Sequence, residues 1–498
     1  MKIIEKLCIT ATVGICAMNV NMSFGAYTDK QCDELKRTSA DLIEKVEKER
    51  IFSPETMEVI AHQLDNCSKD DWADVKSTFI LLCLNCNPWE LKKLTPDERK
   101  SIFENLKAGK FDNCRRVLEN LNKFEEKSLI LRKITNTDGP KKFIATVLAI
   151  ISQNKCITSL YLEENSISCY GAETLAEVLK TNNTSLVSLD LSGNQIGDDG
   201  VKALAKALET NTSLVYLYLS GNQIGDDGVK ALADALKTNT SLKNLYLSGN
   251  QIGDDGVKAL AKALETNTSL DYLDLSGNQI GDDGVEALAD ALRINTFLKN
   301  LYLSRNQIGD DGVKALAEAL KTDKAKALAE TPWDHYRLDL SENQIGDDGV
   351  KALAEALKNN NYLGKLNLSH NQIGDIGAKD LAEALTDNRK LKKLYLSYNN
   401  IGREGARYFA VAFKIHCHLI KLDLCGNQIG DDGAKDLAEA LEYNRELSIL
   451  LLDSSVGNVG AQAFLNLLDK NKSLSELYLP GDKIDDSIRK RLEAILRE

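Results

Sequence analysis

The second part of the chain alternates short apolar segments of two different periods. In the stretch LVYLYLSGN, Leu217 and Leu219 occupy every second position, which is typical of a β-strand with one buried face. In the following GVKALADALKTN, Val229, Leu232 and Leu236 fall on one face of an α-helix. Each unit of strand, turn and helix can bury its apolar face only against the next unit. The pattern predicts a curved parallel stack with the sheet on the concave side.

The units recur with a fixed spacing. Asparagines lie 28 residues apart at positions 194, 222, 250, 278 and 306, and again at 343, 371, 399 and 427. The step from 306 to 343 is nine residues too long, and it contains the pentapeptide KALAE twice, followed by TPWDHY. We interpret this as a nine-residue insertion near 321–335. An anchor patch made by Trp333, His335 and Tyr336 is the alternative. Twelve strand segments are predicted, beginning at Ile157, Leu186, Leu214, Leu242, Leu270, Leu298, His335, Leu363, Leu391, Leu419, Leu447 and Leu474.

One unit can be written L-x-x-L-x-L-x-x-N-x-I-G-x-x-G-x-x-x-L-A-x-x-L. This consensus resembles the leucine-rich repeat, in particular the 28-residue class of ribonuclease inhibitor and of NOD-like immune receptors. The resemblance covers roughly two thirds of the chain. It implies an α/β horseshoe solenoid over residues 131–498, with parallel strands on the concave side, helices on the convex side and about 12 repeats.

The decapeptide LSGNQIGDDG, first found at 191–200, is copied almost unchanged along the array. We expect its asparagine to satisfy backbone groups where the chain leaves the strand, and its Asp pair to cap the helix that follows. Calcium is the alternative, but an oxygen cage needs six to eight converging ligands and a ladder spaces them apart. The motif is therefore interpreted as structural, without a metal. The NTS triplets at Asn211, Asn239 and Asn267 are either glycosylation sequons or, the preferred reading, helix ends in the left-handed region.

Contact residues are expected where the copies differ, at the outward strand position between the last two leucines. It reads Tyr161, Asp190, Tyr218, Tyr246, Asp274, Tyr302, Asp339, Asn367, Tyr395, Asp423, Leu451 and Tyr478. Twelve strands make this a stripe on the order of 55 Å long, which suits a protein partner. Two positions earlier, four consecutive units carry Arg337, Lys365, Lys393 and Lys421. The alternative is that these residue types merely suit a solvated sheet.

The first 130 residues follow a different pattern. Residues 1–25 combine Lys2 and Lys6, an apolar run and small residues before a cut after Gly25, as in a secretory signal peptide. Residues 26–130 contain short capped helical segments and are predicted to form a small all-α domain. Five of the chain's eleven cysteines lie there, including Cys83 and Cys86, for which disulfides, inert thiols or a metal or redox role stay open.

The net charge of −12 argues against a nucleic-acid partner, and outside the N-terminus the chain has no apolar run long enough to span a membrane. We found no nucleotide-binding, protease or hydrolase motif and predict neither a cofactor nor catalysis. The leading hypothesis is an exported, periplasmic or secreted, effector-like monomer that binds a protein partner. The alternative is an effector-type ubiquitin-ligase substrate receptor. The repeat core GVKALA resembles bacterial effectors of the GALA type, and residues 52–65 loosely resemble an F-box, with Ser53 in place of its leucine.

Overall fold

The computed structural model describes residues 128–130, 157–180, 185–321, 336–480 and 483–497. The predicted signal peptide, the predicted helical domain before residue 128, its F-box-like segment and most of the insertion lie outside the described residues. The chain divides into two compact units, Met1–Asn194 and Gln195–Glu498, and each is described by itself.

In the first unit, three short parallel strands pair in sequence order. They are β1 (Ser128–Ile130), β2 (Ser159–Tyr161) and β3 (Ser188–Asp190), with helix α9 (Cys169–Lys180) between β2 and β3. Among the described residues the first strand is β1, which lies just before residue 131, the predicted start of the array.

In the second unit, helices and strands alternate without exception among the described residues. The elements are α10 (Gly197–Leu208), β4 (Tyr216–Tyr218), α11 (Asp226–Leu236), β5 (Asn244–Tyr246), α12 (Asp254–Leu264), β6 (Tyr272–Asp274), α13 (Asp282–Ile294), β7 (Asn300–Tyr302), α14 (Asp310–Leu320), β8 (Arg337–Asp339), α16 (Asp347–Asn359), β9 (Lys365–Asn367), α17 (Asp375–Asp387), β10 (Lys393–Tyr395), α18 (Arg403–Ile415), β11 (Lys421–Asp423), α19 (Gly430–Leu441), β12 (Ile449–Leu451), α20 (Asn458–Leu468), β13 (Glu476–Tyr478) and α21 (Asp486–Arg497).

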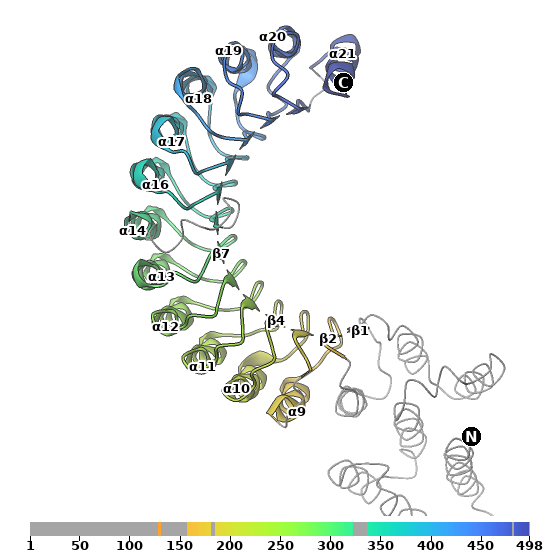
Figure 1. The fold of residues 1–498 in the computed structure, drawn as a ribbon, viewed down its shortest axis with the longest axis vertical. Helices are drawn as coiled ribbons and strands as arrows, with labels where there is room; N and C mark the ends of the chain where they lie inside the picture. The colour runs from red at the N-terminus through yellow and green to blue at the C-terminus, as the bar shows by residue number, and fades with distance from the viewer. Residues whose placement is uncertain (1–127, 131–156, 181–184, 322–335, 481–482, 498) are drawn as a thin grey trace, which may run out of the picture. The chain divides into compact units, whose positions relative to one another are not determined.

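Strands β4 to β13 pair in parallel with their sequence neighbours. Figure 1 shows this unit as an arc, with the strands along its inner side and the helices along its outer side. The middle residue of most strands is a fully buried leucine, such as Leu245 and Leu366. Helix residues such as Val257 and Leu260 close the other side of the core. The predicted horseshoe array of parallel strands and outer helices is confirmed.

The asparagine at each strand exit joins two successive repeats. Asn250 is buried, and its Nδ2 donates to the carbonyl oxygens of Leu247 in its own repeat and Leu219 in the preceding one, at 2.9 and 3.0 Å. Its Oδ1 accepts the backbone N–H of Ile224 at 3.1 Å. The amide therefore satisfies buried backbone groups, as predicted, and most of these bonds cross from one repeat to the one before.

The Asp pair caps a helix, but not the one predicted. Asp226 is the first residue of α11, yet its Oδ1 accepts the backbone N–H groups of Gly253 and Gly256 at 2.7 and 3.0 Å. Gly253 is the N-cap of α12, and Gly256 is the third residue of that helix. Each first aspartate thus caps the helix of the following repeat. A Cβ added at Gly256 would lie 2.7 Å from the same oxygen, which explains the second glycine of the motif.

The row of first aspartates is interrupted twice in this unit, by Arg403 in α18 and by Asn458 in α20, whose Oδ1 accepts the backbone N–H of Asp485. Arg403 occupies the position of the first aspartate in α18, and it pairs instead with Asp432 at 2.8 Å. The next helix, α19, begins differently from its neighbours, because Gly430 adopts a φ of +66° and donates its N–H to Ser455 Oγ. Losing the carboxylate from one repeat coincides with a changed helix start in the next.

The NTS asparagines do not end the helices in the left-handed region, so that expectation is wrong. Asn295, the equivalent residue one repeat later, has φ −69° and ψ 123°. Asn239 is buried, and its Nδ2 donates to the carbonyls of Leu208 and Asn211 in the preceding repeat. Its Oδ1 accepts the N–H of Leu242 at 2.8 Å. This second ladder also excludes Asn239 as a glycosylation site in the folded chain.

The predicted insertion leaves the sheet in register. Helix α14 ends at Leu320, and β8 pairs with β7 so that Asn300 lies opposite Arg337. Of the alternative anchor patch, Trp333 and His335 lie outside the described residues, whereas Tyr336 is buried and meets Tyr362 edge-on, with ring centroids 5.5 Å apart. Burial raises the pKa of both phenols to about 12.

Candidate functional site

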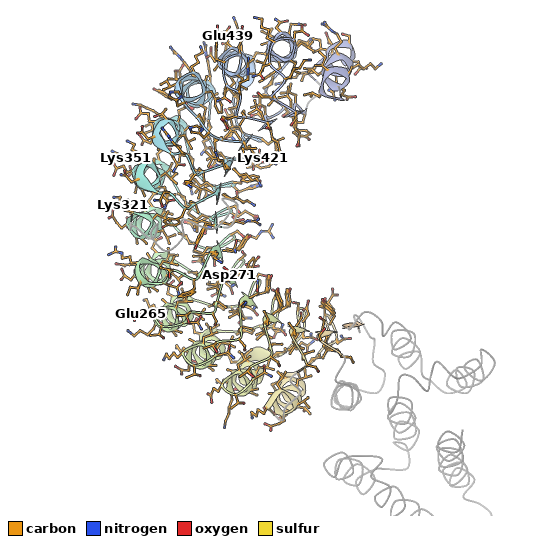
Figure 2. All side chains as sticks on the ribbon, in the orientation of Figure 1. Glu265, Asp271, Lys321, Lys351, Lys421 and Glu439 are labelled. Atoms are coloured by element: carbon orange, nitrogen blue, oxygen red, sulfur yellow. The ribbon has the colours of Figure 1, made fainter. Side chains whose placement is uncertain are left out.

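The inner face of the second unit presents two rows of side chains, because the first and third residues of each strand point away from the buried leucine. The first-position row consists of Tyr216, Asn244, Tyr272, Asn300, Arg337, Lys365, Lys393, Lys421, Ile449 and Glu476. The third-position row consists of Tyr218, Tyr246, Asp274, Tyr302, Asp339, Asn367, Tyr395, Asp423, Leu451 and Tyr478. Figure 2 shows Lys421 on the strand side, whereas Lys351 and Glu439 project from the outer helices. The predicted stripe is thus half of a two-row surface.

The first two predicted contact residues belong to the first unit. Tyr161 ends β2 and lies in register with Asp190 at the end of β3. Asp190 is buried, and its Oδ1 accepts the backbone N–H of Ser192 at 2.9 Å. Asp190 is therefore a structural residue of its own turn.

Four tyrosines from both rows form a continuous aromatic ladder, Tyr218, Tyr246, Tyr272 and Tyr302. Tyr218 and Tyr246 stack at a centroid distance of 4.2 Å, with their planes only 10° apart. Tyr246 to Tyr272 is 4.7 Å, and Tyr272 to Tyr302 is 5.0 Å. The ladder crosses from the third-position row to the first and back, stepping around Asp274. Such stacked and tilted ring contacts stabilise aromatic pairs beyond simple burial.

The predicted contact set omitted Tyr216 on β4 and Tyr272 on β6, because in the first-position row it included only the four basic residues on β8 to β11. The first-position row reads Tyr, Asn, Tyr, Asn over strands β4 to β7, and this alternation was the available signal. Desolvation by burial raises the pKa of Tyr246 and, more strongly, that of Tyr272, where the charge of Asp274 adds to the effect. Tyr246 and Tyr272 therefore stay neutral at physiological pH, and the ladder offers ring surface together with hydroxyl groups.

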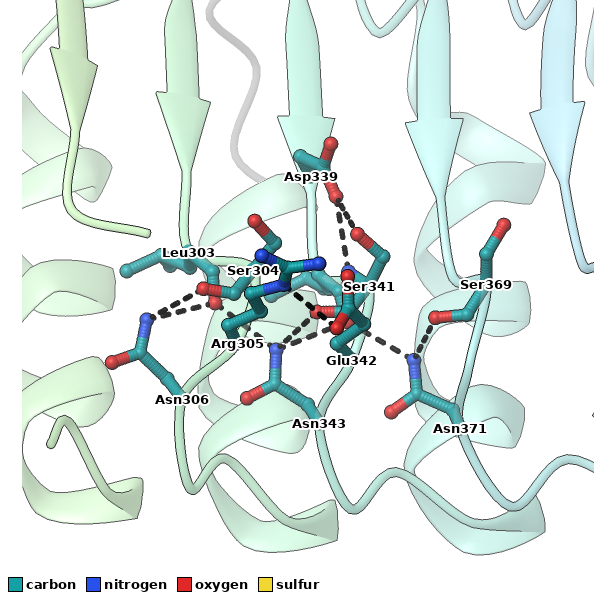
Figure 3. Close-up of polar contacts among 11 residues, drawn as sticks. Leu303, Ser304, Arg305, Asn306, Asp339, Ser341, Glu342, Asn343, Ser369 and Asn371 are labelled. Carbon is teal, nitrogen blue, oxygen red and sulfur yellow. Dashed lines mark hydrogen bonds and ion pairs between the residues drawn. The ribbon is translucent and has the colours of Figure 1, made fainter. Parts of the chain in front are cut away.

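The aspartates of the third-position row hold their own turns. Asp274, Asp339 and Asp423 each accept the backbone N–H two residues later, at distances of 2.9 to 3.0 Å. Asp339 also accepts Ser341 Oγ–H, as Figure 3 shows, and its second oxygen accepts the amide of Asn367 at 3.0 Å. These carboxylates terminate strands in the way an Asx turn does. They contribute charge to the face, but their orientation is set by the backbone.

A basic row begins at β8. Arg337, Lys365, Lys393 and Lys421 are half-buried and lie opposite one another on four successive strands. The Nζ atoms of Lys365 and Lys421 lie 4.8 and 5.2 Å from the ring centroid of Tyr395, within cation–π distance. Lys365, Lys421 and Tyr395 thus form one cluster, and Arg337 and Lys393 extend the row of cations on β8 and β10. Tyr478, at the far end of the array, is 53 % exposed and sits on the last strand.

A set of residues that the sequence analysis did not consider borders this face at the strand exits. The residue before the strand-exit asparagine (Asn250 and its equivalents) is glycine with positive φ in several repeats, such as Gly249 at +66°. In four successive repeats it is Arg305, Glu342, His370 or Tyr398, all with φ between +54° and +56°. Arg305 and Glu342 form an ion pair at 2.7 Å (Figure 3), and His370 stacks on Tyr398 at 4.2 Å. The left-handed conformation costs about 1 kcal/mol for each of these side chains.

Metal chemistry finds no support in the described part of the chain. No group of three or more His, Cys, Asp or Glu side chains converges there in a way that could hold a metal ion. Burial raises the pKa of the Cys417 thiol, between two histidines, to about 11, and burial beside Asp423 raises that of Cys425 to about 12. Both thiols stay protonated and unreactive at neutral pH.

The repeat unit matches a known sequence family. A family model described as "Leucine Rich repeat" matches residues 182–205, 210–233, 238–261, 266–289, 295–317, 337–354, 359–382, 387–410 and 416–438. The chain carries leucine-rich repeats. These nine matches coincide with successive strand–helix units of the structure, and proteins with leucine-rich repeats typically bind other proteins.

Comparison with solved structures gives weaker likenesses. An internalin (inlF) from Listeria monocytogenes str. 4b F2365 is 22 % identical with a TM-score of 0.39, covering 68 % of this chain and 93 % of that one. The structure described as "Leiomodin-1 Actin-Binding Site 2" is 24 % identical with a TM-score of 0.27, covering 31 % of this chain and 92 % of that one. No curated protein matches the sequence. Among the described leucine-rich repeats, no helix is long and apolar enough to cross a membrane.

Proposed function

We propose that the chain is a non-catalytic scaffold that binds a protein partner through the inner strand face of β4 to β13, as a monomer. The observation that carries this proposal is the aromatic ladder of Tyr218, Tyr246, Tyr272 and Tyr302. All four rings are half-buried on a rigid sheet, so little conformational entropy remains to be lost when a partner covers them.

Tyrosine suits this role because it combines a large apolar ring with a hydroxyl group. Buried interface tyrosines often contribute about 2 kcal/mol each when truncated to alanine. The ladder spans four strands, and strands lie about 4.8 Å apart, so the aromatic zone alone extends over roughly 14 Å. That length fits a peptide segment or a protein surface better than a small metabolite.

The 28-residue spacing and the full helix in each unit of the structure support the ribonuclease inhibitor-like subclass. The basic, apolar and small residues of 1–25 support export and an effector-like role. Export has a direct test, namely the intact mass of the chain secreted by a bacterial host. A mature N-terminus at Ala26 is expected, and exported chain that still begins at Met1 would contradict the signal peptide.

The binding proposal is tested by selecting a displayed random-peptide library on the immobilised full-length chain. A variant with Tyr218, Tyr246 and Tyr302 changed to alanine serves as the comparison. Tyr443→Ala is the matched control, because Tyr443 is 74 % exposed and lies just beyond α19, away from the strand face. Selected peptides should lose at least about 100-fold in affinity on the triple variant and keep it on the control. Equal binding to all three chains would refute the proposal.

A further inference from the structure

The first-position row changes its chemistry between β7 and β8. Over β4 to β7 it carries tyrosine and asparagine, and over β8 to β11 it carries four cations, Arg337, Lys365, Lys393 and Lys421. The Cα register places each cation directly opposite the next, on strands about 4.8 Å apart. The row is a local concentration of positive charge in a chain whose net charge is −12.

This arrangement works against the stability of the isolated sheet. Like charges directly opposite one another on neighbouring strands are destabilising. Lys393 lies between Lys365 on one side and Lys421 on the other, so it bears this repulsion twice. A ligand with negative charge would relieve the repulsion when it binds, and the sheet therefore favours an anionic occupant.

Tyr395 organises the row for such a ligand. Lys365 comes from β9 and Lys421 from β11, and both place their Nζ within about 5 Å of the Tyr395 ring on β10, at 4.8 and 5.2 Å. A cation–π contact weakens neither charge, but it restricts two flexible side chains to the strand face. Less side-chain entropy is then lost on binding.

The neighbouring carboxylates indicate which kind of anion fits. Asp339 and Asp423 lie two residues after Arg337 and Lys421, and their orientation is fixed by hydrogen bonds to their own turns. A nucleic-acid strand carries a phosphate charge about every 3.4 Å and would place some of these charges beside the aspartates. A polypeptide presents separate carboxylates with neutral groups between them, and it can avoid this repulsion.

We propose that Arg337, Lys365, Lys393 and Lys421 bind an acidic polypeptide segment, rich in Asp or Glu, of the protein partner. This inference rests on the proposed function, and it assigns the two halves of the strand face different roles. The aromatic ladder takes the apolar part of the partner, and the basic row takes the acidic segment and fixes its direction along the array.

The test measures fluorescence anisotropy with the full-length chain and three labelled probes. The probes are a ten-residue peptide of alternating Glu and Ser, its Gln counterpart and a ten-nucleotide oligothymidylate. The test variant carries Lys365→Gln, Lys393→Gln and Lys421→Gln. The control carries Lys202→Gln, Lys230→Gln and Lys314→Gln on the outer helices, which removes the same total charge from side chains that are 45 to 47 % exposed.

The Glu peptide should bind the wild-type chain, lose about tenfold in affinity on the test variant and change less than about twofold on the control. The Gln peptide should not bind. The inference is overturned if the Glu peptide shows no binding up to about 1 mM, or loses affinity equally on both variants. It is also overturned if oligothymidylate binds the row as tightly as the Glu peptide does.

The library selection separates this inference from the proposed function. Tyrosine-dependent binders without acidic residues, unaffected by the three Lys→Gln changes of the test variant, would overturn the inference and leave the protein-binding role intact. A selection that returns no tyrosine-dependent binder would instead refute the proposed function itself.

Discussion

Replacing Asp254 with alanine should destabilise the start of helix α13, although Asp254 belongs to α12. Its Oδ1 accepts the backbone N–H groups of Gly281 and Gly284 at 2.8 and 3.1 Å, and these residues are the N-cap and third residue of α13. Alanine leaves both N–H groups without their charged acceptor and removes a negative charge from the positive end of the helix dipole.

The expected loss is about 2 kcal/mol in the free energy of unfolding. A hydrogen bond to a charged group contributes about 1.5–3 kcal/mol, and loss of a helix cap costs about 0.5–2 kcal/mol. The contributions of two hydrogen bonds to one partly exposed oxygen do not add fully, because water enters the vacated site and hydrogen-bonds to the N–H groups. Asp255→Ala is the control, since Asp255 is exposed, and it should change stability by less than about 0.5 kcal/mol.

Hydrogen exchange followed by mass spectrometry measures this effect locally, which matters because a long repeat array need not unfold as one unit. A loss of 2 kcal/mol corresponds to roughly thirtyfold faster exchange at the start of α13. The amides around Gly253 and Gly256, at the start of α12, should be unaffected. Faster exchange at the start of α12 alone, or equal effects of Asp254→Ala and Asp255→Ala, would show that capping across repeats is wrong.

Three further changes test the same framework. Asn278→Ala should lower the free energy of unfolding in urea by about 3 kcal/mol, because it leaves buried backbone groups in two repeats without hydrogen-bond partners. Gln279→Ala, at an exposed site, should leave this free energy unchanged. Equal losses for the two variants would contradict the role of the strand-exit asparagine. Arg403→Asp should raise stability by about 1 kcal/mol and let Gly430 adopt the ordinary helix start, and a loss of stability would refute the role of the missing carboxylate. Burial raises the pKa of Tyr272 above 10, so the folded state binds more protons than the unfolded state at alkaline pH, and stability should fall as pH rises above about 10. Tyr272→Phe should flatten that fall in thermal melts between pH 9 and 11, and an unchanged slope would contradict the assignment.

Much of the candidate site could be read from the sequence because a strand has a period of two. Once the leucines were placed inside, the outward position of every copy followed, including those of Tyr395, Lys365 and Lys421. The contact of the two lysines with the Tyr395 ring is seen only in the structure. The aromatic ladder could not be read in the same way. Tyr246 and Tyr272 belong to different rows, and their contact at 4.7 Å depends on side-chain directions across the sheet.

The roles of the acidic residues also required the structure. A sequence shows that Asp226 precedes a helix segment, and the nearest N–H groups along the chain are those of its own helix. In the stacked array the nearest available donors are Gly253 and Gly256, which lie 27 and 30 residues away. Similarly, Asp339 belonged to the predicted contact stripe, and only its bonds to Ser341 and Asn367 reveal that it also holds a turn.

The sequence by itself determined the repeat length, the order of strand and helix, the buried leucines and the identity of the outward residues, because these follow from periodicity and from the need to bury apolar side chains. The tertiary structure decided which hydrogen-bond donor pairs with which acceptor. Hydrogen bonds and ring contacts form between atoms that are close in space, and in a solenoid the residue one repeat away is often nearer than the residue one turn away. In the folded array the copied motif therefore forms hydrogen-bond ladders between repeats. The two rows of variable residues form an aromatic zone and a basic zone.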